Sequence, residues 1–533
     1  MSICDSSNKY IKLLTQINSS SKSSLQKSPY NKYKKYISTI SNKFIKSHNT
    51  LLSLLFKIKN NTKFTITYTE ISLKNSSENS SIYSIPKFID IFRYLINKNT
   101  VDNHDNDFLN KFNIEEQKIL KDKLSHKYTK SQCYKFLDKS ILGKKVISVY
   151  NSISVNLSND LLHKFPSLKF HKLLINSFTS YKILEDLELN ITSLIQYSIV
   201  YEGHTLDNFV YLFTYDTFNN KNNNKNNTKN NNKNNKSHNY DYILDLGKDI
   251  IKRILFFNKF LNNKHYPDKF IIFLTNNKKE IDKELRDNIH FKTININTAV
   301  TDGNDIIIYR EQELFKSIFH ELIHFHNLDF RHISTDILNN IISYLIKTHN
   351  IKENNEYLIY ECITESLANI LNNIYYSGTL KEMNINLQNE IIFSTLQISK
   401  ILNICKYKKW SEFTYNSDDS DDSEREKSIK TITDKSKQFT QDSCVFSYYI
   451  LKLYILLNLD RYFKYVLDSK MKFIQSKQSF DYLIDIFDST RKNILLEEFI
   501  NSILQGLIKH KNKKYNKTKK YKDIKKTLRM TCL

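Results

Sequence analysis

The chain contains 533 residues, with 80 lysines and arginines against 56 aspartates and glutamates, a formal net charge of +24. Its six glycines leave little scope for phosphate-binding loops, and the patterns G-x-x-x-x-G-K-[ST], G-x-G-x-x-G and G-x-S-x-G are all absent. No run of about eighteen apolar residues occurs, and the start lacks the apolar stretch of a secretory signal. We therefore expect a soluble protein and exclude nucleotide-binding loops and a serine-hydrolase elbow.

The six cysteines are widely spaced and form no C-x-x-C pair. This spacing predicts neither a disulfide framework nor a structural zinc site, and it favours a reducing, intracellular compartment. The cysteines are Cys4, Cys133, Cys362, Cys405, Cys444 and Cys532.

The first half of the chain divides by composition. Residues 1–50 form a basic segment, rich in Ser and Lys, that we expect to begin poorly ordered. Apolar stretches over residues 51–216 predict a mostly helical N-terminal domain with some strand and no catalytic motif. Residues 217–239 are an Asn- and Lys-rich low-complexity linker that cannot bury a core. A second domain is predicted over residues 240–408.

Two strand signals open this second domain. The apolar run KFIIFLTNN, starting at Lys269, predicts a buried strand. KTININTAVTDGNDIIIYRE predicts a hairpin with one strand over 293–300, a turn at Asp302-Gly303 and a second strand over 306–309. The predicted fold class is therefore α+β and predominantly helical, with a small sheet or hairpin before the segment described next.

The segment ELFKSIFHELIHFHN contains the motif His320-Glu321-Leu322-Ile323-His324. Two histidines four apart lie on one face of a helix, so both imidazoles can reach one ion, and Glu321 stands beside that face. A buried helix would normally have apolar or small residues at these positions, because unpaired ionisable groups are costly to bury. The alternative is a surface helix with incidental histidines. The apolar positions at helical spacing are Leu314, Phe315, Ile318, Phe319, Leu322, Ile323 and Phe325.

This segment resembles the active-site helix of the zincin metallopeptidases, over about fifteen residues. A catalytic zinc usually has three protein ligands, so a third residue must join the two histidines. The metzincin pattern fails, because its glycine and third histidine positions are Asn327 and Phe330. His332 and Asp329 could approach only if the chain folds back after the helix.

A second apolar helix is predicted between Leu358 and Ile374, with Asn354 or Asn355 as its cap and Gly378 as its stop.

Along this helix run Glu361 and Glu365, which would repel each other unless a cation lies beneath them. In gluzincins the third ligand is a helical glutamate, and an acid four residues later orients a zinc histidine. The resemblance thus implies Glu361 as ligand and Glu365 as the acid that holds a ligating histidine. The two roles could be exchanged, and two solvated glutamates on an exposed face are the simpler alternative.

The resemblance implies a zinc peptidase that holds one Zn²⁺ through His320, His324 and Glu361, with Glu321 as general base. In zincins a strand beside the active-site helix pairs with the substrate, and Thr293 to Val300 is the candidate here, although an internal hairpin is equally consistent. Tyr448 and Tyr449 are the candidate oxyanion donors, against the alternative that both pack in the core.

The abundance of Ile, Asn, Lys and Tyr resembles that of giant DNA viruses of amoebae or AT-rich protists, and the chain resembles zinc metalloproteinases of such viruses. For a viral protein this predicts the host cytoplasm or the virion.

The last part of the chain alternates acidic, helical and basic segments. Residues 409–443 are an acidic, Ser-rich insertion, and apolar periodicity predicts a helical subdomain over 444–507. The basic tail, 508–533, has eleven Lys or Arg against one Asp within 509–529, a charge of +10. Such a tail predicts nonspecific nucleic-acid binding or simply solubility. The alternative to a peptidase is therefore a basic nucleic-acid-binding or virion-associated structural protein with a degenerate zincin domain.

Overall fold

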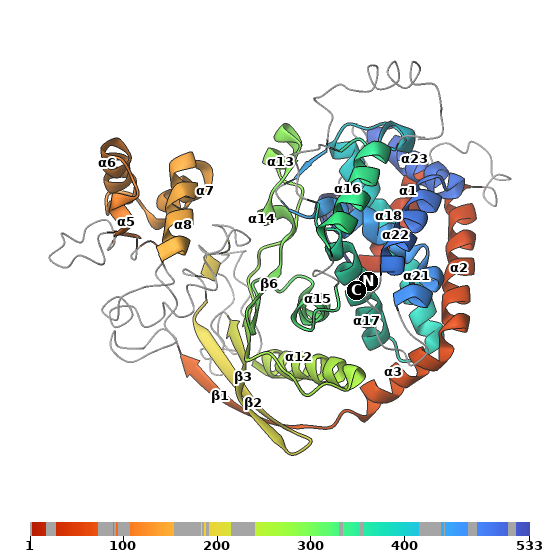
Figure 1. The fold of residues 1–533 in the computed structure, drawn as a ribbon, viewed down its shortest axis with the longest axis horizontal. Coiled ribbons are helices and arrows are strands. Elements are labelled where there is room, and N and C mark those ends of the chain that lie inside the picture. The colour runs from red at the N-terminus through yellow and green to blue at the C-terminus, as the bar shows by residue number, and fades with distance from the viewer. Residues whose placement is uncertain are drawn as a thin grey trace.

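Figure 1 shows the computed structural model of the chain. It describes residues 3–16, 28–72, 107–153, 191–214, 240–329, 334–351, 357–414, 439–441, 443–466, 477–509 and 519–533, and a few single positions between 89 and 187. The described residues form a predominantly helical α+β fold with a six-stranded mixed sheet and a separate two-stranded one. At this level the predicted fold class is confirmed.

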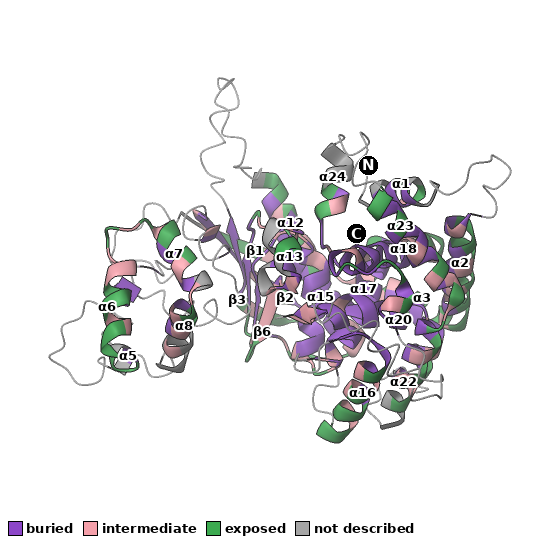
Figure 2. Ribbon diagram, turned by 90° about the horizontal axis from the view of Figure 1, so that it is seen from above, coloured by how far each residue is buried: buried purple, intermediate pink, exposed green. Residues whose placement is uncertain are grey.

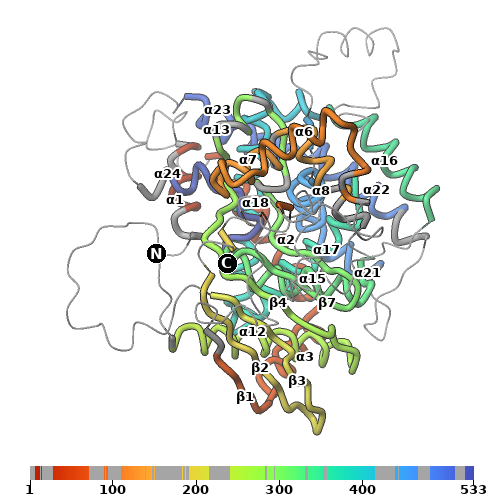
Figure 3. Tube along the Cα trace, turned by 90° about the vertical axis from the view of Figure 1, so that its left-hand side faces the viewer, coloured from red at the N-terminus to blue at the C-terminus, as the bar shows by residue number. Residues whose placement is uncertain are grey.

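The larger sheet has the strand order β1-β2-β3-β4-β7-β6, which leaves β6 at an edge. β1, β2 and β3 are mutually antiparallel, β4 runs parallel to β3 and to β7, and β6 returns antiparallel to β7. Figure 3 shows the red and yellow strands of the N-terminal half beside the green β4 and β7. The strands are β1 (Thr65–Ser72), β2 (Ser193–Tyr201), β3 (His204–Thr214), β4 (Lys269–Phe273), β6 (Ala299–Asp302) and β7 (Asp305–Ile308).

This sheet crosses the domain boundary that we predicted at residues 217–239. β3, from the N-terminal half, pairs in parallel with β4, so Val210 lies opposite Phe270 and Phe213 opposite Phe273. Half of the six strands therefore come from residues 51–216, and these residues share one core with residues 240–408. The linker itself lies outside the described residues.

The hairpin before the motif differs from its prediction at one end. Residues Thr293–Ile296 form the short helix α14, so the predicted strand 293–300 is wrong in its first half and β6 begins at Ala299. The buried Asn295 explains the difference, since its side chain accepts a hydrogen bond from the Lys292 amide and donates to the Glu280 carbonyl. The turn lies at Gly303 (φ 59°), close to the predicted position.

The helix α15 (Leu314–Phe325) carries the histidine motif and lies at the centre of the fold. It contacts α12 (Tyr240–Leu261), α17 (Tyr360–Tyr376), β6 and β7, and Figure 1 shows it between the sheet edge and α17. Figure 2 shows that α15 and α17 are buried almost throughout. α16 (Thr335–Thr348) occupies the connection between them. Residues 352–356, and with them the two predicted caps of α17, lie outside the described residues, and α17 ends just before Gly378.

Most remaining elements form a helical layer on the other side of α17 from the sheet (Figure 1). They include a π-helical segment, η6. α13 and α14 lie on the β6 side of α15 instead, and β5 between them in the chain pairs in parallel with β8. α5 to α8 form a small group apart from this layer. The elements are α1 (Ile3–Gln16), α2 (Pro29–Ser47), α3 (Asn49–Asn61), α5 (Asp107–Asn110), α6 (Ile114–Lys123), α7 (Lys130–Lys139), α8 (Ile141–Ile153), α13 (Lys283–Asn288), β5 (His290–Phe291), α18 (Leu380–Ile404), η4 (Trp410–Glu412), β8 (Thr440–Gln441), η6 (Phe446–Leu451), α20 (Lys452–Leu456), α21 (Leu459–Val466), α22 (Lys477–Arg491), α23 (Ile494–Lys509) and α24 (Lys519–Lys526).

Both ends of the chain are more ordered than predicted. The first fifty residues contain α1, which buries Tyr10 and Ile11 in the core, and α2, which buries Tyr33, Ile37 and Phe44. At the other end, residues 527–532 are buried after α24 apart from the partly exposed Arg529, and Met530 is 3% exposed. The many lysines of both segments obscured these apolar positions, so the prediction of a poorly ordered start and a solvated end is wrong for the described residues.

Two further predictions concern membranes and cysteines. Among the described residues, we find no helix with the length and apolar character needed to cross a bilayer. Cys133, Cys362, Cys405 and Cys444 are free thiols, whereas Cys532 is disulfide-bonded, unlike our expectation for a chain without a disulfide framework.

Candidate metal centre

Two histidines and one glutamate meet on the inner faces of α15 and α17. His320 Nε2 and His324 Nε2 each lie 3.3 Å from Glu361 Oε2, and the two nitrogens are 3.1 Å apart. Ligands bound to zinc at about 2.0–2.1 Å in tetrahedral geometry are separated by roughly 3.3 Å, so these three atoms have the spacing of three corners of a zinc site. Within the described residues they are the one group of three or more His, Cys, Asp or Glu side chains close enough to hold an ion.

The surroundings of Glu361 also fit a cation. Its Oε2 atom is buried and accepts no hydrogen bond from the described residues. Burial alone would raise the pKa of Glu361, but the adjacent His324 and His320 imidazoles hold it well below its usual range. A buried carboxylate oxygen that faces only two imidazole nitrogens is incomplete without a shared ion or proton.

Each histidine is oriented by a carboxylate on its other nitrogen. His320 Nδ1 lies 3.0 Å from Glu365 Oε2, and His324 Nδ1 contacts Asp329 just after α15. When Nδ1–H donates to a carboxylate, the Nε2 lone pair remains for a metal. Glu365 therefore takes the position expected of an orienting acid, and Glu361 that of a ligand. Asp329, considered above as a ligand, lies behind His324 instead, and His332 lies outside the described residues.

Glu365 has a second partner that sequence reasoning missed. Lys316, one helical turn before His320, donates to Glu365 Oε2 at 2.7 Å and to Oε1 at 3.0 Å. Burial would raise the pKa of Glu365, but Lys316 and His320 lower it strongly, so this carboxylate stays ionised. A lysine four residues before a histidine on an otherwise apolar helix was the available signal.

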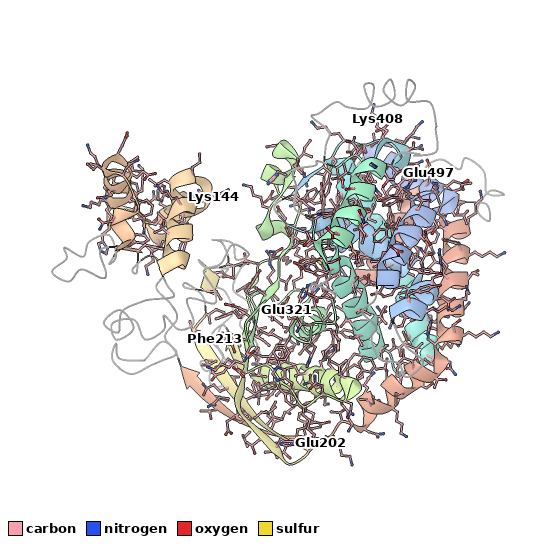
Figure 4. All side chains as sticks on the ribbon, in the orientation of Figure 1. Lys144, Glu202, Phe213, Glu321, Lys408 and Glu497 are labelled. Atoms are coloured by element: carbon pink, nitrogen blue, oxygen red, sulfur yellow. The ribbon has the colours of Figure 1, made fainter. Side chains whose placement is uncertain are left out.

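Glu321 lies beside His320, His324 and Glu361 and is hydrogen-bonded to the edge strand β6. The Thr301 hydroxyl of β6 donates to Glu321 Oε2 at 2.7 Å. Glu321 is 4% exposed, and Figure 4 places it between β6 and the helices. This contact fixes the carboxylate next to the three ligand atoms without using its second oxygen.

A cavity of about 190 Å³ opens onto the three candidate ligands and Glu321. One wall comes from residues 296–301, which include most of edge strand β6, and the opposite wall from α15 and Tyr360. The remaining lining residues are Lys279, Glu361, Tyr448 and Met530.

The two tyrosines proposed as oxyanion donors separate in the structure. Tyr448 lies in the π-helix η6 and lines the cavity, with its ring 5.9 Å from that of His320. Tyr449 instead donates its hydroxyl to the Leu528 carbonyl, so it is engaged in the core. Tyr360 also lines the cavity, 6.3 Å from His324 between ring centroids, and nothing in its sequence position distinguished it.

The comparisons with known proteins do not extend these observations. No protein-family model, no curated protein and no solved structure matches the chain.

Proposed function

We propose that the protein is a zinc-dependent peptidase of the gluzincin type. His320, His324 and Glu361 would hold the ion, and Glu365 and Asp329 would fix the two imidazoles. The single observation that carries the proposal is the spacing of the three ligand atoms, 3.1 to 3.3 Å, with Glu321 beside them. Zinc, when bound, supplies a Lewis acid that polarises a carbonyl and lowers the pKa of water.

The chain's own residues supply the remaining chemistry. Glu321, positioned by Thr301, accepts a proton from the attacking water and delivers it to the leaving amine nitrogen. Tyr448 and Tyr360 both line the cavity, and one of their hydroxyls would donate a hydrogen bond to the carbonyl oxygen as negative charge develops there. The outer edge of β6, without a strand partner in the described sheet, can pair with an extended peptide. This β6 edge takes the place of the longer strand predicted over 293–300.

A degenerate zincin domain in a nucleic-acid-binding protein is the less favoured function. The ligands, their orienting carboxylates and Glu321 with Thr301 are all present together, and a degenerate site would be expected to lack some of them.

The test is the Glu321→Gln variant of the full chain. We expect it to retain stoichiometric zinc while peptide hydrolysis falls by at least about a thousandfold, because the amide cannot accept a proton. Zinc content is measured by metal analysis and cleavage with a mixed peptide library. His326→Gln is the matched control, since His326 contacts Asn263 outside the site and its loss should leave hydrolysis unchanged. Hydrolysis by Glu321→Gln at the rate of the unaltered chain would contradict the proposal.

A further inference from the structure

We propose that the metal cavity contains an anion subsite, formed by Lys279 and Lys316, that binds a carboxylate group of the substrate. The inference rests on the proposed function and extends it to a substrate class. Both lysines line the cavity that holds the metal ligands. Lys279 is 1% and Lys316 3% exposed, so both ammonium groups are removed from bulk water.

The carboxylate partners of the two lysines lie behind the cavity wall. Lys279 Nζ is 2.7 Å from Glu313 Oε2, and Lys316 Nζ is 2.7 Å from Glu365 Oε2. Neither glutamate lines the metal cavity, whereas both lysines do. The positive member of each ion pair is therefore the one nearer to a bound substrate.

The two ammonium groups retain capacity to donate. Among the described residues Lys279 Nζ meets one acceptor, Glu313, although an ammonium has three donors. Lys316 uses two donors on Glu365, and its third contact is the Met530 sulfur at 3.5 Å, which is a weak acceptor. An anionic oxygen in the cavity would be a better acceptor for both lysines.

The burial of Lys279 is only partly offset by its carboxylate partner. Burial lowers the pKa of Lys279 to about 8 although Glu313 opposes the shift, so one carboxylate does not fully offset the cost of burying the cation. Each lysine is already paired with one carboxylate, so the two together suit a singly charged carboxylate better than a phosphate dianion. The partly exposed Arg529, 4.0 Å from Glu313, adds further positive charge from outside the cavity.

The carboxylate could belong to an aspartate or glutamate side chain or to the end of a peptide. Both sources present the same group to Lys279 and Lys316. In the first case the protein would cleave beside acidic residues, and in the second it would remove residues from a free C-terminus. Binding of paired peptides distinguishes the two sources.

The experiment measures peptide binding to the zinc-loaded Glu321→Gln protein, so that it does not depend on turnover. One pair of peptides, blocked at both ends, differs only by Asp against Asn. A second pair has no acidic side chain and differs by a free against an amidated C-terminus. We expect the carboxylate member of at least one pair to bind tenfold or more tightly by calorimetry. The Asp/Asn pair identifies a side-chain carboxylate, and the other pair a terminal one.

Substitutions then locate the subsite. Lys279→Met should remove most of the preference, whereas the neighbouring Lys278→Met should leave it unchanged, because Lys278 is exposed and does not line this cavity. If Lys279→Met fails to fold with Glu313 left unpaired, the double variant Lys279→Met/Glu313→Gln removes both charges and should also lose the preference. A preference that persists in these variants would place the carboxylate on zinc and overturn the inference.

The two proposals fail in different ways. Cleavage of peptides without any carboxylate preference would support the peptidase and overturn the subsite. Lysine-dependent binding of carboxylate peptides, without hydrolysis by the unaltered zinc-loaded protein, would support the subsite and overturn the peptidase.

Discussion

The ionisable groups of the two halves of the buried helix α15 have different partners. The C-terminal half carries His320 and His324, whose Nε2 atoms, the proposed metal ligands, lie 3.3 Å from Glu361 Oε2. The N-terminal half follows the N-cap residue Glu313 and includes Lys316. Here Glu313 contacts Lys279 and backbone amides, and Lys316 contacts Glu365. Glu313 even adopts a left-handed conformation (φ 65°), which is uncommon for a residue with a side chain.

The difference shows how to distinguish a ligand site from a structural ion network. In the structural network each of Glu313, Glu365 and Glu390 has a lysine ammonium group within 4 Å, and Glu313 and Glu390 also accept the backbone amides of residues 530–532. In the ligand site Glu361 Oε2 instead faces the His320 and His324 imidazoles, and no lysine or arginine of the described residues lies within ion-pair distance of it. Substitutions in the first half should therefore change folding, and those in the second should change metal binding.

The largest expected effect separates the two glutamates of α17. Glu361→Gln should lose stoichiometric zinc, because it removes the anionic ligand. Glu365→Gln should keep zinc with about 10- to 100-fold weaker affinity, because the amide oxygen can still accept from His320 Nδ1. Competition with a chelator of known affinity measures both. The reverse order of effects would exchange the roles of the two residues.

A second prediction concerns the contribution of the structural ion network to the stability of the fold. Lys452 is fully buried, donates to the Met530 carbonyl at 2.5 Å and lies 3.8 Å from Glu390. Lys452→Met should lower the free energy of unfolding by about 3–5 kcal/mol, since it leaves a buried carboxylate without its cation. Urea denaturation measures the loss, and the folded fraction should bind zinc normally.

The double variant Lys452→Met/Glu390→Gln is the matched control for this stability prediction. It removes both charges, so it should recover part of the lost stability. If Lys452→Met is as stable as the unaltered chain, the ion network does not stabilise the fold. If it loses zinc while folded, the network and the metal site are not separate.

The sequence could predict those parts of the site whose residues lie close together along the chain. His320, Glu321 and His324, and the pair Glu361 and Glu365, lie within single helices, where the 3.6-residue repeat fixes which side chains share a face. Their meeting across two helices was inferred from family resemblance, and the structure brings the same residues together.

Partners contributed by distant segments could not be predicted in the same way. Thr301 reaches Glu321 because β6 lies at the sheet edge beside α15, and Met530 reaches Lys316 across 214 residues. Residues 508–533 were interpreted by their net charge, which hid the apolar Leu528 and Met530 that pack in the core. The fold class could be predicted, but the strands contributed by residues 51–216 could not, because their apolar runs do not distinguish strand from helix.

The smallest predicted effect is a pH dependence confined to the metal half of α15. Burial alone would lower the pKa of His324, but Glu361 and Asp329 outweigh burial and raise it to about 10 in the metal-free chain. At pH 7 this imidazole therefore holds a proton that zinc must displace.

Zinc affinity should accordingly rise with pH, by about tenfold per unit for each proton displaced, until the pH passes the raised pKa. Calorimetry in two buffers of different ionisation enthalpy should detect the release of about one proton or more per zinc at pH 7. Lys452→Met should release the same number, because Lys452 contacts Glu390 and Met530 rather than the ligands. Zinc binding without proton release at pH 7 would show that His324 is already neutral, and that Glu361 and Asp329 do not stabilise its charged form.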